Sequence, residues 1–293
     1  MRFASYFYAS LASTIGLIAH VIYTREQFYP IVLYLVTSKI SFVVLGNMGI
    51  ATVILIGRLS NSIFLGSLRE AEVELLFDRA KYTITETCLA LTIFRNELSP
   101  PILAMFGALL FLKAFHWLSK SRVDHLEQVG VTTTATHVKL VSLLCILSFC
   151  DVFIAYMCIQ YTIKNGRSVL ILFGFEFGLQ VISILNTVGR YILHMIDTQL
   201  ADGLSSKGLY VMLCDLVCDA LRFVIYVFFF SLVFVYYGLP LHIVREVWVA
   251  FYTFQRKLTS FIKYVGDPCY ARRQCGIVLF VLRCSALFYA VLC

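Results

Sequence analysis

Six long apolar runs follow one another along this chain, separated by polar connections. A helix needs roughly 20 residues to cross the ~30 Å hydrocarbon core of a bilayer, and each run comes close to or exceeds that length. Only helices and closed barrels satisfy their backbone hydrogen bonds in lipid. The pattern therefore predicts an all-α, polytopic membrane bundle with spans near residues 5–23, 40–56, 102–118, 140–161, 169–195 and 209–237.

Two further segments are ambiguous, so the expected number of transmembrane helices is six to eight. Residues 82–94 are too few to cross comfortably and carry Glu86, whereas residues 275–293 are numerous enough but are interrupted by Arg283. Before the first of these segments, leucines spaced along residues 65–76 alternate with acidic positions. This spacing is typical of an amphipathic helix, which we expect to lie along the membrane interface before the chain turns back at Tyr82.

Composition supports the membrane interpretation. The chain has 293 residues, of which 60% are hydrophobic and 14% charged, and its mean hydropathy is +0.85. These values lie outside the range of soluble domains. The first apolar run follows Arg2 closely and no clear small-x-small cleavage site comes after it, so it is interpreted as a retained signal-anchor rather than a cleaved signal peptide.

The positions of lysine and arginine suggest an orientation. Cytosolic connections of membrane proteins are enriched in these residues. With six spans, the basic connections are residues 57–101, the turn with Lys164 and Arg167, and the segment 245–263 after the last span. This favours a cytosolic location for both termini. The net charge of +7 is then explained by anionic lipid headgroups, and we expect no nucleic-acid partner.

Several ionisable side chains fall within the apolar runs. Such groups are costly in a bilayer and are retained for partners, water or function. A rise of 1.5 Å per residue brings Lys113, Asp151 and Glu176 near the midplane. Asp219 and Arg222 stand three residues apart on one helix and can pair with each other. The candidate residues for lining a cavity or pairing helices are therefore Lys113, His116, Asp151, Glu176, Asp219 and Arg222.

Two interpretations of these residues stay open. The first is a set of ion pairs that join helices, and the second is a hydrated, polar-lined cavity. Gly174 and Gly178 flank Glu176 and would permit close approach of a backbone or client peptide, which slightly favours the cavity. No hydrolase triad, metalloprotease motif or phosphate-binding loop occurs, so no catalytic residue is expected. Cys214 and Cys218 lack further ligands nearby, so we expect core packing and no metal.

Several sequence blocks in the same order resemble a known family. The blocks are QFYP at 27–30, LREAEVELLFDR followed by TETCLALTIFR, LLFLKAFHWL continuing to RVDHLE, FGFEF at 173–177 and YILHMID at 191–197. Together they resemble the membrane domain of synoviolin, the Hrd-type ubiquitin ligase of endoplasmic-reticulum-associated degradation. The likeness covers residues 3–264, so we expect a membrane domain over 1–264.

The resemblance implies a protein of the endoplasmic reticulum membrane with both termini in the cytosol. Its helices would form a cavity through which misfolded clients are retrotranslocated. Implied partners are a derlin-like protein, lumenal adaptor and lectin components and a cytosolic AAA ATPase, and a homo-oligomer is expected. Catalysis in the family comes from a zinc-binding RING-H2 domain after the last helix, which recruits a ubiquitin-conjugating enzyme.

The end of the chain departs from the family pattern. A RING-H2 domain needs paired Cys and His ligands in closely spaced motifs, whereas the last four cysteines, at Cys269, Cys275, Cys284 and Cys293, are spaced six, nine and nine residues apart. We therefore expect residues 265–293 to be a divergent apolar tail, truncated or frameshifted in origin. No zinc or other cofactor is expected in this chain, and whether it has enzymatic activity stays open.

Three functions are compatible with these observations. The first is the membrane domain of a degradation-linked ubiquitin ligase, whose ubiquitin transfer depends on a RING-H2 domain absent here. The second is a polytopic transporter or channel, which would predict inverted internal repeats with Gly- or Pro-broken helices, and none is visible. The third is a non-catalytic scaffold isoform of the ligase. The third differs from the first only in whether a full-length product exists. A ubiquitination assay tests the interpretation of the tail, and uptake or conductance measurements test the second.

Overall fold

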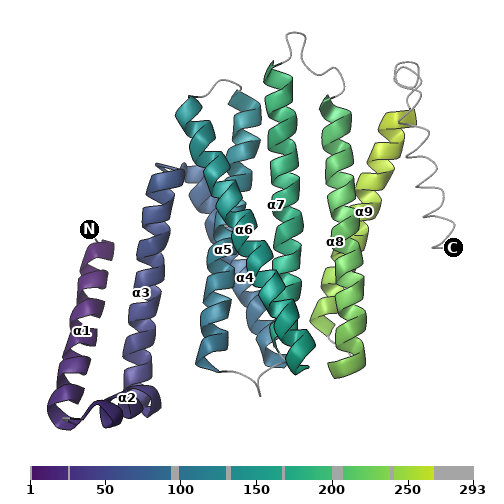
Figure 1. The fold of residues 1–293 in the computed structure, drawn as a ribbon. Helices are drawn as coiled ribbons and strands as arrows, with labels where there is room; N and C mark the ends of the chain where they lie inside the picture. The colour runs from purple at the N-terminus through teal and green to yellow at the C-terminus, as the bar shows by residue number, and fades with distance from the viewer. Residues whose placement is uncertain are drawn as a thin grey trace. The chain divides into compact units, whose positions relative to one another are not determined.

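The computed structural model describes residues 2–25, 27–93, 99–129, 133–166, 169–199, 207–237 and 241–266. Within these residues it is all-α, as predicted. The helices of this described part are α1 (Arg2–Arg25), α2 (Phe28–Thr37), α3 (Lys39–Phe64), α4 (Glu70–Ile93), α5 (Pro100–Val129), α6 (Thr134–Asn165), α7 (Leu170–Gln199), α8 (Lys207–Tyr237) and α9 (Leu241–Gly266) (Figure 1).

Six of the described helices are long and apolar enough to cross a membrane, namely α1, α3, α5, α6, α7 and α8. They correspond to the six predicted spans, so that prediction is confirmed. Most extend several residues beyond the apolar run at one or both ends. The extension is expected because helices continue into the polar interface until a turn residue or a proline ends them.

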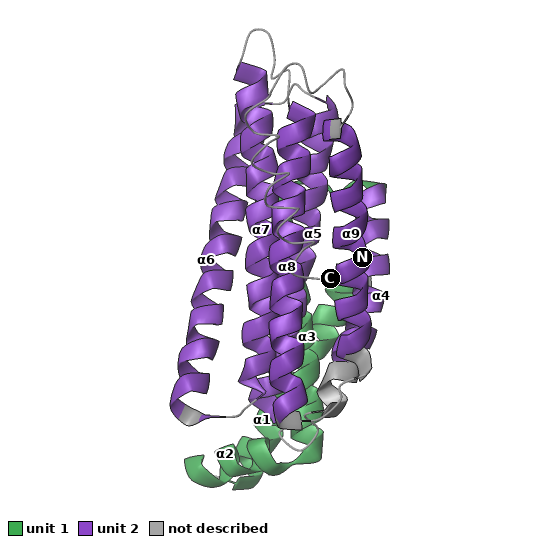
Figure 2. Cartoon of the chain, turned by 90° about the vertical axis from the view of Figure 1, so that its right-hand side faces the viewer, with its two compact units in different colours: residues 1–70 green, residues 71–293 purple. Residues whose placement is uncertain are grey.

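The chain divides into two compact units, residues 1–70 and 71–293 (Figure 2). In the first unit, α1 and α3 contact each other along their length. The Tyr6 hydroxyl donates to Asn47 Oδ1 at 2.7 Å, and Asn47 Nδ2 donates to Ser10 Oγ at 2.9 Å. Such side-chain hydrogen bonds stabilise helix pairs in lipid, where apolar burial supplies little driving force.

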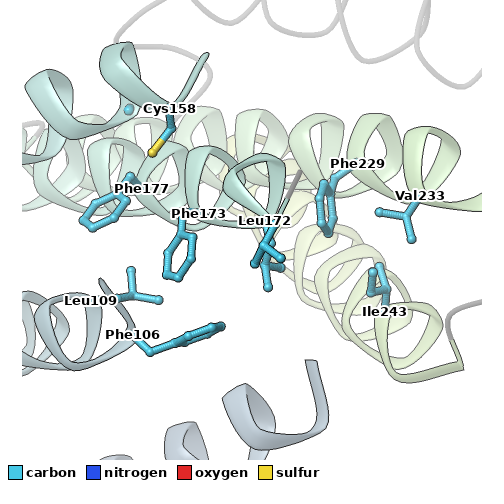
Figure 3. Close-up of a cluster of buried hydrophobic side chains, with 11 residues drawn as sticks. Phe106, Leu109, Cys158, Leu172, Phe173, Phe177, Phe229, Val233 and Ile243 are labelled. Atoms are coloured by element: carbon cyan, nitrogen blue, oxygen red, sulfur yellow. The ribbon is translucent and has the colours of Figure 1, made fainter. Parts of the chain in front are cut away.

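The second unit contains α4 to α9, and each helix runs antiparallel to the one before it (Figure 1). α7 contacts α5, α6 and α8, and α9 lies along α8. One hydrophobic cluster joins α5, α6, α7, α8 and α9, with Phe106 packed on Phe173 at a ring-centroid distance of 4.6 Å and Val233 near Ile243 (Figure 3). The side chains of this unit are therefore organised around α7.

The expected turn at Tyr82 is wrong, because α4 is one continuous helix. Residues 70–93 contain no glycine and no proline, so nothing in them interrupts a helix once it has begun. The break in helical structure instead comes before α4, where Gly66 adopts φ +71°, a left-handed conformation that glycine accepts without steric cost. The two segments predicted separately, 65–76 and 82–94, thus largely merge into one long helix.

The basic segment 245–263 is part of a helix rather than a tail after the last span. In α9, Phe254, Leu258 and Phe261 follow each other at helical spacing and pack with Leu209 and Leu216 of α8. The same helix carries its charges on other faces, which lowers its mean hydropathy. A search for apolar runs therefore did not predict it as a span. Residues 267–293, which include the ambiguous span 275–293 and most of the expected tail, lie outside the described residues.

Candidate polar site within the helix bundle

Lys113 and Glu176 form an ion pair between α5 and α7. Lys113 Nζ lies 2.7 Å from Glu176 Oε2, and the two side chains are only 16% and 17% exposed. Along the chain, α6 comes between α5 and α7 and runs antiparallel to both, so α5 and α7 run in the same direction. Residues at similar depth in these two helices therefore meet. The contact neutralises two charges that would otherwise be costly at this depth.

His116 and Asp151 form a second contact, between α5 and α6. His116 Nε2 lies 2.7 Å from Asp151 Oδ2, and the side chains are 5% and 0% exposed. The contact joins two polar side chains of neighbouring helices that are otherwise surrounded by the bundle. Because this pair is sealed from its surroundings, its geometry is that of a helix-pairing contact.

A larger ionic network joins four helices. Arg190 of α7 donates through Nε to Asp215 Oδ1 of α8 at 3.0 Å, makes a second contact with the same carboxylate, and reaches Asp124 of α5 at 3.2 Å. Lys257 of α9 lies 2.5 Å from Asp219 and 4.0 Å from Asp215. This network therefore connects α5, α7, α8 and α9.

Asp219 and Arg222, the pair predicted on α8, lie 3.6 Å apart. The shorter contact of Asp219 is with Lys257 on the neighbouring helix. Neither Lys257 nor Arg190 was among the residues predicted from the sequence. One signal was present, because Asp215, Asp219 and Arg222 recur at i, i+4 and i+7 and so share one face of α8, which indicates a polar neighbour on that side.

Two contacts of α4 join it to other helices of its unit. Glu72, whose side chain is fully buried, lies 2.8 Å from Arg122 of α5. Further along α4, the Tyr82 hydroxyl donates to Glu246 Oε1 of α9 at 3.2 Å, and Arg245 lies over the Tyr82 ring. Polar contacts therefore link α4 to both α5 and α9.

A polar hollow of about 180 Å³ opens between α8 and α9. Its lining includes Asp219, Arg222 and Tyr226 from α8, and Glu246 and Thr253 from α9. Of the sequence-predicted residues it thus includes Asp219 and Arg222, whereas Lys113, His116, Asp151 and Glu176 are not part of its lining. The hollow presents charges of both signs and hydroxyl groups, which suit hydrogen bonding to uncharged polar groups as well as to ions.

Gly174 and Gly178 do not share a site with Glu176, which they flank in sequence. Glu176 contacts Lys113 on α5, whereas the two glycines line an apolar groove next to α6 and α8. Residues two apart on a helix point in different directions. The close approach that we expected beside Glu176 therefore lies on another face of α7.

Comparison with known proteins identifies the family. The model of the family described as "E3 ubiquitin-protein ligase synoviolin-like, TPR repeats" matches residues 2–266. The chain belongs to this synoviolin-like family. The similarity inferred above from the sequence blocks is therefore confirmed. The match covers every described helix, including α4 and α9, which are not apolar enough to be recognised as spans.

A curated relative gives the synoviolin-like family its context. The chain is 23% identical over 267 residues to the ERAD-associated E3 ubiquitin-protein ligase hrd1 of Schizosaccharomyces pombe. The aligned region is 90% of this chain but 39% of the relative. The chain therefore corresponds to less than half of that ligase. Its described residues form a synoviolin-like membrane domain with multiple candidate spans.

Proposed function

We propose that this chain is the membrane domain of a ligase of endoplasmic-reticulum-associated degradation and that it binds misfolded polypeptides and moves them through its helix bundle. Membership of the synoviolin-like family and the name of the fission yeast relative support the first part. The observation that carries the second part is the polar hollow between α8 and α9.

The chemistry of the hollow suits a polypeptide better than an ion. Ion channels line their pores with one sign of charge or with rings of carbonyls. Here Asp219 and Glu246 line the same small space as Arg222. A polypeptide in a membrane must satisfy its backbone donors and acceptors, and mixed charges together with Tyr226 and Thr253 supply both kinds of partner.

Ubiquitin transfer would depend on a RING-H2 domain, as the family resemblance implies. Such a domain holds two zinc ions and recruits a ubiquitin-conjugating enzyme. The cysteine spacing of residues 265–293 does not fit these ligand sets, so no step of transfer is assigned to this chain. A derlin-like protein, lumenal adaptors and a second copy of the ligase are the partners proposed for the membrane domain.

Cross-linking to a client tests the polar hollow directly. A photoreactive amino acid at Thr253, which lines the hollow, is expected to cross-link to a misfolded client in the full-length ligase. The matched control is the next residue, Tyr252, which is exposed on α9 and is not part of that lining. Cross-linking is measured by immunoblotting for the client after irradiation.

A clear excess at position 253 over position 252 supports passage of polypeptide beside α8 and α9. Equal labelling at the two positions would show that the client contacts the outside of the bundle instead. Ion conductance in proteoliposomes that Glu176→Gln abolishes would favour a channel and contradict the proposed function.

We also propose that α4 and α9 cross the membrane together with the six apolar helices, in the endoplasmic reticulum. Each is as long as a span requires, and each has polar contacts inside the bundle. An even number of crossings keeps both ends of the chain on one side. This eight-span topology differs from the six-span interpretation in the side of the membrane to which it assigns the connections after α4.

Charge distribution within residues 71–266 supports this topology. We call the ends of this bundle the α6–α7 end and the α7–α8 end after the connections they carry. Near the α7–α8 end lie Lys120, Arg122, Lys139, Lys207, Lys257 and Lys263, whereas Lys164 and Arg245 lie near the α6–α7 end, whose connections also contain Arg95 and Arg167 in the sequence. The positive-inside rule then assigns the α7–α8 end to the cytosol, and with it the cytosolic termini.

Glycosylation mapping tests this topology. An N-glycosylation acceptor inserted in a flexible linker at the connection 165–168 is expected to be modified, because the proposed topology makes that connection lumenal. The matched insertion at 130–132 is expected to stay unmodified. The readout is a gel shift that is sensitive to endoglycosidase. Modification at 130–132 and not at 165–168 would instead restore the six-span orientation.

A further inference from the structure

An apolar groove runs between α6 and α8 across the surface of α7. Its volume is about 600 Å³. Toward the α6–α7 end, α6 leans away from α7 (Figure 2). The floor of the groove includes Gly174 and Gly178 of α7, and its walls include Ile159 and Ile163 of α6 with Phe228 and Leu232 of α8.

The two glycines of α7 make the groove deep. A Cβ atom added at Gly174 would come within 3.5 Å of Cys158 on α6, and one added at Gly178 would meet nothing within 4 Å. Position 178 is therefore open space that a side chain would fill. Phe175, between the two glycines, stacks on Phe229 of α8 with ring centroids 3.9 Å apart, which fixes the wall on that side.

The length of the groove fits one leaflet of a bilayer. From Leu170 to Gly178 the rise along α7 is about 12 Å, at 1.5 Å per residue. This is close to half of the ~30 Å hydrocarbon core. A partner helix would need a groove along the whole span and a width of about 10 Å. A lipid acyl chain needs only the depth of one leaflet.

One basic residue lies beside the mouth of the groove. Thr162, Ile163 and Gly166 line the groove at the α6–α7 end, and Lys164, within the same turn, is exposed there. The N-terminus of α7, which carries a partial positive charge, lies at this mouth as well. None of the described residues that line the groove is acidic.

We propose that this groove binds an anionic phospholipid, with one acyl chain on Gly174 and Gly178 and the headgroup at Lys164. The walls offer apolar contact along the chain, and the lysine attracts the phosphate and the headgroup charge. The site is separate from the polar hollow between α8 and α9, so it goes beyond the proposed function and does not depend on it.

The binding test compares two lipids and two leucine substitutions. The full chain is purified in mild detergent and titrated with phosphatidylserine or phosphatidylcholine, and bound lipid is counted by native mass spectrometry. Gly178→Leu, which fills the floor, is expected to weaken phosphatidylserine binding about tenfold or more, because the acyl chain loses its buried apolar contact. The matched control Gly107→Leu adds the same side chain at an exposed, open position of α5 and is expected to bind like the unsubstituted chain.

A second pair of variants tests the headgroup contact. Lys164→Ala is expected to remove most of the preference for phosphatidylserine over phosphatidylcholine. Lys139→Ala, which removes an exposed lysine at the opposite end of α6, is expected to retain it. Equal binding by Gly178→Leu and Gly107→Leu, or no headgroup preference in the unsubstituted chain, overturns the proposal.

Photolabelling of the unsubstituted chain gives a readout that no folding defect can affect. Phosphatidylserine with a diazirine on its acyl chain is expected to label Ile163 or Phe228, and excess unlabelled phosphatidylserine is expected to suppress the label. Label that competitor does not reduce shows only bulk lipid contact and contradicts the site. In a separate variant with a photoreactive amino acid at position 163, a cross-link to a second copy or another polypeptide would assign the groove to a protein partner instead, and would also overturn the proposal.

Discussion

Replacing Arg190 with leucine is expected to lower the free energy of unfolding of the bundle by about 3–5 kcal/mol. Arg190 is shared by Asp215 and Asp124. Its removal leaves Asp215, whose side chain is 14% exposed, without its guanidinium partner, and it also removes a contact of the more exposed Asp124. The expected result is a large decrease in melting temperature, measured by scanning fluorimetry of the protein in mild detergent.

The matched control for Arg190 is Arg256→Ala, which removes an exposed arginine from α9. Surface charges contribute little to stability, so this variant is expected to melt like the unsubstituted protein. Replacing Asp215 with asparagine in the Arg190→Leu background removes one of the unpaired carboxylates and is expected to recover part of the loss. Similar melting temperatures for Arg190→Leu and Arg256→Ala would show that the network does not stabilise the bundle.

The second large effect is expected from His116→Leu, with a loss of about 3–5 kcal/mol for the single substitution. Asp151 is fully buried and lies 2.7 Å from His116, so the variant buries a carboxylate without its partner. The double variant His116→Leu with Asp151→Leu removes both charges and is expected to regain near-normal stability, since buried pairs can often be replaced by apolar residues of similar volume. Both are measured as melting temperatures.

This cycle also distinguishes helix pairing from a direct role in client passage. If the pair only joins α5 and α6, the double variant is expected to be stable and to retain client cross-linking at position 253. Loss of cross-linking in a stable double variant would assign a functional role to the pair. His20→Leu, a substitution at an exposed histidine of α1, controls for the loss of an imidazole, and a His116→Leu variant as stable as this control would contradict the expected effect.

The local sequence was sufficient to predict the six apolar helices. Each contains a long run of apolar residues, and the transfer of such a run into lipid does not depend on its neighbours. The same property explains why Lys113, Asp151 and Glu176 were recognisable as candidates, because a charged residue within an apolar run is rare and costly. The sequence blocks shared with the family identified it for a similar reason, because each block is a short run of consecutive residues.

The partners of these residues were not predictable in the same way. Lys113 and Glu176 are 63 positions apart in the chain, and no local rule shows that α5 and α7 run in the same direction next to each other. Arg190 was missed because it is the single arginine or lysine of α7, and Lys257 was missed because it is one of several basic residues on α9. Their importance follows from the carboxylates of α8, which face them only after the helices pack.

The amphipathic helices α4 and α9 show the same limit. Their polar faces lower the average hydropathy, so a search for apolar runs divided α4 at Tyr82 and assigned α9 to a tail. In the folded unit, Glu72 meets Arg122 and Lys257 meets Asp219, so polar residues that would be unfavourable in lipid are satisfied by other helices.

By itself, the sequence determined the helical class, the six apolar spans, the family and the set of ionisable residues within the membrane. The tertiary structure decided which of these residues pair, that α4 and α9 belong to the bundle, that a polar hollow opens beside Asp219 and Arg222, and that the glycines around Glu176 form an apolar groove on a different face. The physical reason is that burial in lipid depends on the composition of one segment, whereas the neutralisation of a charge depends on which faces of separate helices come together.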